Sequence, residues 1–89
     1  MEYEWDEQKA ASNFRKHKLT FDDGVAVFDD PAHVIIEASR ERDREVRSKA
    51  IGTFKGAVYV VVFTVRGKVR RIISARRANV KEKKAYGHR

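Results

Sequence analysis

The sequence predicts an α+β domain, with a short N-terminal strand and two helices packed on one face of a twisted antiparallel sheet. One observation is the helical spacing of apolar residues in the first third of the chain. A second is a series of four segments with strand-like alternation in the remainder. A third is the pair of short breaks Lys55-Gly56 and Arg66-Gly67, whose glycines suit tight hairpin turns. We expect a single domain over residues 1–89 whose other sheet face stays free.

The N-terminal elements are predicted from the signals at their ends. Residues 2–5 alternate polar and aromatic side chains, which is typical of a short strand at a sheet edge. Asp6 can cap a helix that ends near His17, because its carboxylate accepts the free amides of the first turn. Thr20 opens a second helix, which ends before Pro31. The apolar stripe of this second helix consists of Phe21, Val25 and Phe28.

The rest of the chain is expected to form four strands and a short closing helix. The expected strands are 33–37, 45–54, 57–65 and 68–76, with a charged loop over 39–44. The last three strands form an antiparallel meander, because only two residues separate each from the next. Residues 79–86 are expected to be helical, with Gly87 just beyond them.

Charge is segregated along the chain, whose formal net charge is +7. Residues 1–38 hold four Lys/Arg and nine Asp/Glu, a difference of −5, and residues 39–89 hold sixteen and four, a difference of +12. A segregated basic half predicts contact with nucleic acid, because each phosphate contact releases counterions. The alternative is a basic surface that is merely solvated.

Several classes of protein do not fit this composition. There are no cysteines, which excludes disulfides and a thiolate zinc cluster. The histidines, His17, His33 and His88, are dispersed without ligand spacing, so no metal site is expected. Acidic residues follow Met1 where a signal peptide would be cationic, and the longest apolar run, 57–63, is too short to cross a bilayer. We therefore expect a cytoplasmic protein.

Alternation along the last strand predicts the main candidate site. Arg70, Ser74 and Arg76 are expected to share the open face of the sheet, with Ile72 among them. Two arginines flanking a serine can hold a phosphate through planar, bidentate donors, although arginines on a strand also commonly form a solvated face. The residues expected to face the helices are Val69, Ile73 and Ala75.

Other basic residues are expected either to extend this patch or to lie on the opposite face of the sheet. Arg47 and Lys49 share one face of a neighbouring strand and can extend the patch. Arg71 and Arg77 lie an odd number of positions from Arg76, so strand alternation predicts that they point to the opposite face. Either a twist or bulge turns them out, or their side chains reach past the helices.

Outside the strands, a few side chains have both a functional and a structural reading. Lys16 and His17 can take part in proton transfer, or can be helix-end cations placed against the dipole. Tyr86 can bond a phosphate, stack on a base or anchor the closing helix, and the anchor is favoured; Glu82 can hold a nearby arginine. No nucleophile–base constellation occurs, so an enzyme would need a substrate with its own nucleophile, as RNA has in its 2′-hydroxyl.

Four blocks of the sequence resemble, in the same order, those of the BrnT family of toxins. They are Tyr3-Glu4-Trp5-Asp6-Glu7 with Lys9-Ala10, Asn13 and Arg15-Lys16-His17; Phe21 with Val27-Phe28-Asp29-Asp30-Pro31; Arg47 with Ala50-Ile51-Gly52; and Arg70-Arg71-Ile72-Ile73-Ser74-Ala75-Arg76-Arg77-Ala78 with Glu82 and Tyr86. The resemblance covers nearly the whole chain. It departs at Lys18, where the family usually has glycine, and at Val46, where an acidic residue is common.

This resemblance implies a RelE-like fold and RNA cleavage that arrests translation. The implied substrate is mRNA, free or ribosome-associated, and no cofactor is expected. The implied partner is a BrnA-like antitoxin, typically a ribbon–helix–helix protein, through which the toxin–antitoxin complex would contact operator DNA.

The leading hypothesis is therefore a metal-independent endoribonuclease toxin. The candidate catalytic residues are Lys16, His17, Arg70, Arg76, Glu37 and Tyr86. The candidate RNA- or phosphate-binding residues are Arg47, Ser74, Arg77 and Lys49. The alternative is a non-catalytic module that binds nucleic acid or its antitoxin.

Overall fold

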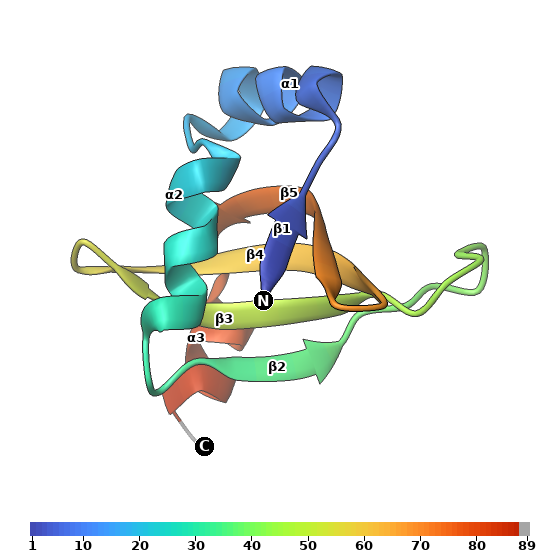
Figure 1. Cartoon of the computed structure of the whole chain (residues 1–89). Coiled ribbons are helices and arrows are strands. Elements are labelled where there is room, and N and C mark those ends of the chain that lie inside the picture. Colours follow the sequence, from blue (N-terminus) through green and yellow to red (C-terminus); the bar gives the residue numbers. More distant parts are fainter. Residues whose placement is uncertain (88–89) are drawn as a thin grey trace.

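Five strands form one sheet in the computed structural model, which describes residues 1–87 (Figure 1). In chain order the elements are β1 (Glu2–Glu4), α1 (Glu7–His17), α2 (Phe21–Val25), the 3-10 helix η1 (Ala26–Asp29), β2 (Val34–Glu37), β3 (Ser48–Phe54), β4 (Ala57–Arg66), β5 (Val69–Arg77) and α3 (Val80–Gly87). Across the sheet the strand order is β1-β5-β4-β3-β2. The predicted α+β class and the order of its elements are confirmed.

The sheet is mixed, because β1 differs in direction from the expected antiparallel pattern. Strands β2 to β5 form the antiparallel meander, with positive φ at Lys55, Gly56 and Gly67 in the two hairpin turns. β1, however, pairs parallel with the first three residues of β5. No hairpin joins β1 to β5, so no tight turn forces the two strands to run in opposite directions.

Both ends of α1 are capped. The Asp6 carboxylate accepts hydrogen bonds from the amides of Gln8 at 2.8 Å and Lys9 at 3.2 Å, as expected. At the other end Lys18 has a left-handed φ of 58°, and its amide donates to the Phe14 carbonyl at 2.8 Å. Lysine thus makes the turn for which glycine is usual, at a conformational cost of about 1 kcal/mol.

The second helix starts where expected and is shorter than expected. The Thr20 hydroxyl accepts a hydrogen bond from the Asp23 amide at 3.0 Å. At Ala26 the α-helix gives way to η1, and this tighter turn changes which side chains face the sheet. Val27 is fully buried, whereas the predicted stripe residues Val25 and Phe28 are only partly buried.

Apolar residues are buried on both faces of the sheet. On the face covered by α1 and α2 the buried cluster contains Leu19, Phe21, Val27, Ala50, Val61, Phe63, Ile72 and Ala75. On the opposite face α3 packs against β3, and Ala85 and Tyr86 lie on a cluster of Ile51, Val60 and Ala78 (Figure 1). The expectation that this second face is free was wrong, because the closing helix folds back across part of it.

The expectations about His88 and about membrane-spanning segments can be compared with the structure as follows. His88 lies outside the described residues. Within residues 1–87, no helix combines the length and the apolar character needed to cross a membrane.

Candidate functional site

A β-bulge in β5 decides which of its side chains share a face. Consecutive residues of β4 lie opposite Ser74 and Ile72, so Ile73 has no partner on that strand. As a result Ile72 and Ala75, three positions apart, are both buried against the helices. The expectation that Arg70 and Ile72 share the open face with Ser74 was wrong, because the extra residue reverses the alternation.

Arg70 and Arg77 both lie on the side of the sheet that α1 and α2 cover. The Arg70 guanidinium lies 4.1 Å from the Phe28 ring centroid and donates to the Tyr3 hydroxyl at 3.4 Å. Arg77 lies 5.7 Å from the ring centroid of Tyr59, which packs on the same cluster. The sheet therefore separates Arg70, a candidate catalytic residue, and Arg77, a candidate RNA-binding residue, from the residues on its other face.

The opposite face carries a hollow with four basic side chains in its walls, termed here the basic hollow. Its volume is about 300 Å³. It is lined by Ala38, Arg40, Arg47, Lys49, Val62, Ile73, Ser74 and Arg76. Arg40 and Arg47 come from the loop between β2 and β3, which extends away from the sheet (Figure 1). The structure thus brings together four of the predicted site residues, Arg47, Lys49, Ser74 and Arg76.

Glu82 of α3 is the buried counterion of Arg76 and Lys49. Its side chain is 3% exposed, and its two oxygens accept a bidentate pair from Arg76, each bond 2.8 Å long. It also accepts hydrogen bonds from Lys49 Nζ at 2.8 Å and from the Asn79 amide at 2.9 Å. These bonds, the Arg76 pair above all, lower the pKa of Glu82 to about 2. The carboxylate therefore stays ionised at neutral pH and holds both cations in place.

A second buried carboxylate, Asp43, orders the other side of the basic hollow. It accepts hydrogen bonds from the Arg40 amide at 2.7 Å and guanidinium at 3.1 Å, and lies 3.7 Å from Arg47 Nε. That Nε is buried and has no hydrogen-bond partner in the described part of the chain. Four cations and two carboxylates leave an excess of positive charge around the hollow.

Lys16 and His17 line a second hollow, the α1 hollow, which shares a wall with the first. Its volume is about 230 Å³, and its lining consists of Lys9, Ser12, Asn13, Lys16, His17, Ile73 and Ser74. The Asn13 side chain ties α1 to this place, because it donates to the Ala75 carbonyl at 2.8 Å and accepts from the Ala75 amide at 3.1 Å. β1 pairs only with residues 69–71, so Asn13 takes the place of a neighbouring strand further along β5.

The environment of His17 favours its neutral form. Burial, then the positive charges of Lys16 and Arg76, lower the pKa of this imidazole from its ordinary value of 6.5. A histidine in this state is mainly unprotonated at neutral pH and can accept a proton. Because Arg76 of the basic hollow lowers the pKa of His17 in the α1 hollow, the two side chains are coupled electrostatically.

Tyr86 and Glu37 line neither of these two hollows. The Tyr86 hydroxyl donates to Asp30 at 2.6 Å, which anchors α3 to the turn before β2. Asp30 also accepts from the amide and the hydroxyl of Thr53, and these hydrogen bonds, led by that of Tyr86, lower the pKa of Asp30. Glu37 is exposed at the end of the edge strand β2 and lines a separate hollow beside α3.

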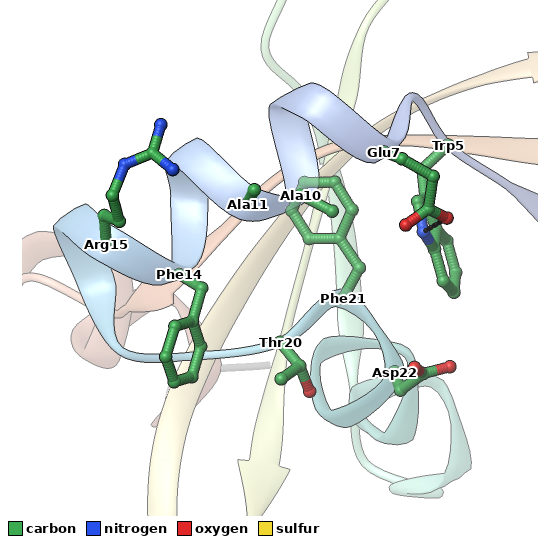
Figure 2. A pocket seen from close by; sticks show the side chains of 9 residues that line it. All are labelled: Trp5, Glu7, Ala10, Ala11, Phe14, Arg15, Thr20, Phe21 and Asp22. Carbon is green, nitrogen blue, oxygen red and sulfur yellow. Dashed lines mark hydrogen bonds between the residues drawn. The ribbon is translucent and has the colours of Figure 1, made fainter.

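A further hollow, of about 470 Å³, lies between α1 and α2 and has different chemistry. Figure 2 shows its lining, which consists of Trp5, Glu7, Ala10, Ala11, Phe14, Arg15, Thr20, Phe21 and Asp22. Aromatic and small apolar side chains dominate it, and Phe14 is 47% exposed. Its charged groups are two carboxylates and one guanidinium, so it lacks the cation cluster that a phosphate backbone needs.

Two structural features that support the site were not predicted from the sequence. Asn79 and Glu82 form a capping box at the start of α3, and the Asn-x-x-Glu spacing is a readable signal for it. The bond between Asn13 and Ala75 has no comparable local signal, because these residues are 62 positions apart.

The fold and the site define a small α+β protein with a hollow lined by four basic side chains on one sheet face. Among the residues with described positions, no group of three or more His, Cys, Asp or Glu could hold a metal ion. A family model described as "Ribonuclease toxin, BrnT, of type II toxin-antitoxin system" matches residues 5–82. The chain therefore belongs to the BrnT family, which confirms the resemblance and its RelE-like fold. A comparison with curated proteins gave no match.

Membership of this family identifies the general activity. The chain is a ribonuclease toxin of a type II toxin–antitoxin system, so its substrate is RNA and it has a cognate antitoxin. The basic hollow is lined by four basic side chains, whereas the apolar hollow between α1 and α2 is lined by one.

Proposed function

We propose that this toxin cleaves RNA without a metal ion, by attack of a ribose 2′-hydroxyl on the adjacent phosphorus. The 2′-oxygen forms a bond to phosphorus while the bond from phosphorus to the 5′-oxygen breaks. A base takes up the hydroxyl proton, and the leaving 5′-oxygen receives a proton from a solvent water molecule. The products are a 2′,3′-cyclic phosphate and a 5′-hydroxyl, and loss of free or ribosome-associated mRNA arrests translation.

The observation that carries this proposal is the wall shared by the two hollows. Ile73 and Ser74 line both of them, so a phosphate beside Ser74 is adjacent to Arg76 in one hollow and to His17 in the other. Such a place combines cations that stabilise negative charge with a group that accepts a proton.

Each side chain then has a role that its chemistry supports. Arg76, Arg47 and Lys49 stabilise the extra negative charge of the pentacoordinate phosphorus. His17, whose pKa is lowered, accepts the 2′-hydroxyl proton, and Lys16 supplies positive charge beside the leaving oxygen. Arg70, Arg77, Glu37 and Tyr86 receive no catalytic role, since they lie outside the two hollows.

We also propose that the cognate antitoxin is a BrnA-like ribbon–helix–helix protein. This rests on the family to which the chain belongs, and it assigns the operator contact to the antitoxin rather than to the toxin. A gene for a small ribbon–helix–helix protein beside the toxin gene supports the proposal, and an adjacent antitoxin gene of another fold contradicts it.

The first prediction compares Arg76→Ala with a matched control, Arg66→Ala. Both variants lose one arginine, but Arg66 is exposed and paired with Glu45 at the β4–β5 hairpin, away from the basic hollow. In buffer with EDTA, we expect Arg76→Ala to cleave RNA roughly 10²-fold more slowly than wild type, and Arg66→Ala to stay close to wild type. The measurement is a single-turnover cleavage assay with analysis of the product ends.

Two outcomes would overturn this proposal. Wild-type cleavage that depends on an added divalent cation contradicts the metal-independent reaction. Absence of cleavage, with and without ribosomes, favours the competing function of a non-catalytic module that binds nucleic acid or the antitoxin.

A further inference from the structure

A buried carboxylate is an unexpected component of a hollow that binds phosphate. Glu82 pairs with both Arg76 and Lys49, so one of the two positive charges is cancelled before RNA arrives. Neutral residues of similar size would leave more positive charge for the substrate. Burial of a carboxylate is also costly, and an ion pair of this kind is weak evidence for a contribution to stability.

The hydrogen bonds of Arg76 indicate what Glu82 contributes. Both terminal nitrogens of Arg76 donate to Glu82, and one of them also donates to the Arg77 carbonyl at 3.2 Å. The Nε of Arg76 donates to no residue within 1–87. Because a guanidinium is planar and rigid, fixing its terminal edge also fixes the direction of the edge that contains Nε.

We propose that Glu82 is a positioning residue, which holds Arg76 and Lys49 in the orientation that RNA cleavage requires and does so at the expense of RNA affinity. This inference rests on the proposed function, because it assigns a role within the same site. Glu82 itself touches neither substrate nor reacting atoms. It acts through Arg76 and Lys49, whose nitrogens lie 2.8 Å from its oxygens.

The inference predicts opposite effects of Glu82→Gln on binding and on cleavage. Binding becomes as tight as wild type or tighter, because a cation is released to the phosphate backbone. If that cation gains one phosphate contact, the plot of log affinity against log salt steepens by about 0.7. The cleavage rate at saturating protein falls roughly 10²-fold, the loss expected when a catalytic group is misplaced by about 1 Å.

The variants separate positioning from a structural role. Gln at position 82 keeps a side-chain oxygen for the Asn79 amide, so the helix cap is retained. The control Asn79→Ala removes the other half of the cap, the bond from the Glu82 amide to Asn79 Oδ1, and leaves both ion pairs. Glu82→Asp keeps the charge on a shorter side chain, so its binding stays close to wild type while its cleavage is only partly restored.

The experiment measures affinity and rate separately. Affinity is measured at several salt concentrations with a 2′-O-methyl oligoribonucleotide, which lacks the nucleophile. The cleavage rate is measured with the matching unmodified RNA, and circular dichroism monitors folding. The expected result is slower cleavage with retained or tighter binding in Glu82→Gln, and nearly wild-type values for both in folded Asn79→Ala.

Two results would overturn the inference and leave the proposed function intact, provided that the wild type cleaves. One is a parallel loss of binding and cleavage in Glu82→Gln, which indicates a structural role. The other is a Glu82→Gln variant with wild-type cleavage. A wild type that does not cleave RNA overturns the proposed function first, and the inference with it.

Discussion

Adjacent arginines of β5 have different partners because strand alternation sends them to opposite faces. Arg76 pairs with Glu82 on the side of α3, whereas Arg77 lies beside Tyr59 on the side of the first two helices. Arg70 would share the face of Arg76 in a regular strand, but the bulge at Ile73 puts it over the Phe28 ring. The two arginines therefore have the same charge but different surroundings, a buried carboxylate for Arg76 and an aromatic ring for Arg77.

His17 gives the prediction that belongs to single residues. Its pKa is lowered below 6.5 by burial, Lys16 and Arg76, so its base form persists into mildly acidic solution. We expect the cleavage rate to rise with pH through an apparent pKa below 6.5 and then to level off. In His17→Gln this limb of the pH profile should disappear. An unchanged limb in the variant would assign the base to another group.

At the scale of elements, α2 packs closely against β4 and β5, and this contact fixes the position of the helix on the sheet. Gly24 of α2 is buried, and a Cβ at this position would lie 2.9 Å from the Ala75 Cβ and 3.3 Å from Val61 Cγ2. The helix therefore rests on β5 and β4 with no room for a side chain. Asn13 binds the same Ala75 from α1, so both helices are fixed at the segment of β5 that follows the bulge.

Gly24→Ala is predicted to destabilise the fold, although alanine favours a helix by about 1 kcal/mol. The new methyl group meets Ala75 inside a packed core, and such overpacking costs about 1–3 kcal/mol. Urea denaturation of the variant should show a lower midpoint than wild type. The matched control is Gly87→Ala, whose Cβ would meet no atom of residues 1–87 within 4 Å and which should not lower the midpoint. A Gly24→Ala variant as stable as wild type would contradict the close packing.

For the whole molecule, two carboxylates hold α3 on the sheet. Glu82 bonds to Arg76 and Lys49, and Asp30 accepts the Tyr86 hydroxyl. The closing helix is thus attached by ionised groups at both of its ends. The same helix covers part of the face that contains the basic hollow, so retention of α3 is a condition for an intact site.

The stability of the whole protein should consequently fall in acid. The folded-state pKa of Glu82 is lowered from 4.5 to about 2, and that of Asp30 is lowered from 3.8. Their stabilising contribution is therefore present above pH 4.5 and is lost as pH falls towards 2. For Glu82 this shift corresponds to a loss on the order of 3 kcal/mol. Urea denaturation across this range is the measurement, and Glu82→Gln should show a smaller acid-dependent loss than wild type.

The fold class, the order of the elements and the segregation of charge can be read from local signals in the sequence. Asp6, Thr20 and the two hairpin turns act on neighbours within a few positions, so their effects can be read locally. The basic character of residues 39–89 and the parity of Arg47 with Lys49 and of Ser74 with Arg76 also follow from the chain alone. These signals were sufficient for the fold class and for much of the basic hollow.

Which of these residues share a site depends on contacts between segments that are far apart in the chain. One extra residue at Ile73 reversed the expected face of Arg70, and the fold-back of α3 placed Glu82 against Arg76 and Lys49. Asn13 brought α1, with its terminal Lys16 and His17, beside β5 by a contact across 62 positions. Such contacts depend on where distant segments meet, and no pattern of neighbouring residues encodes that meeting.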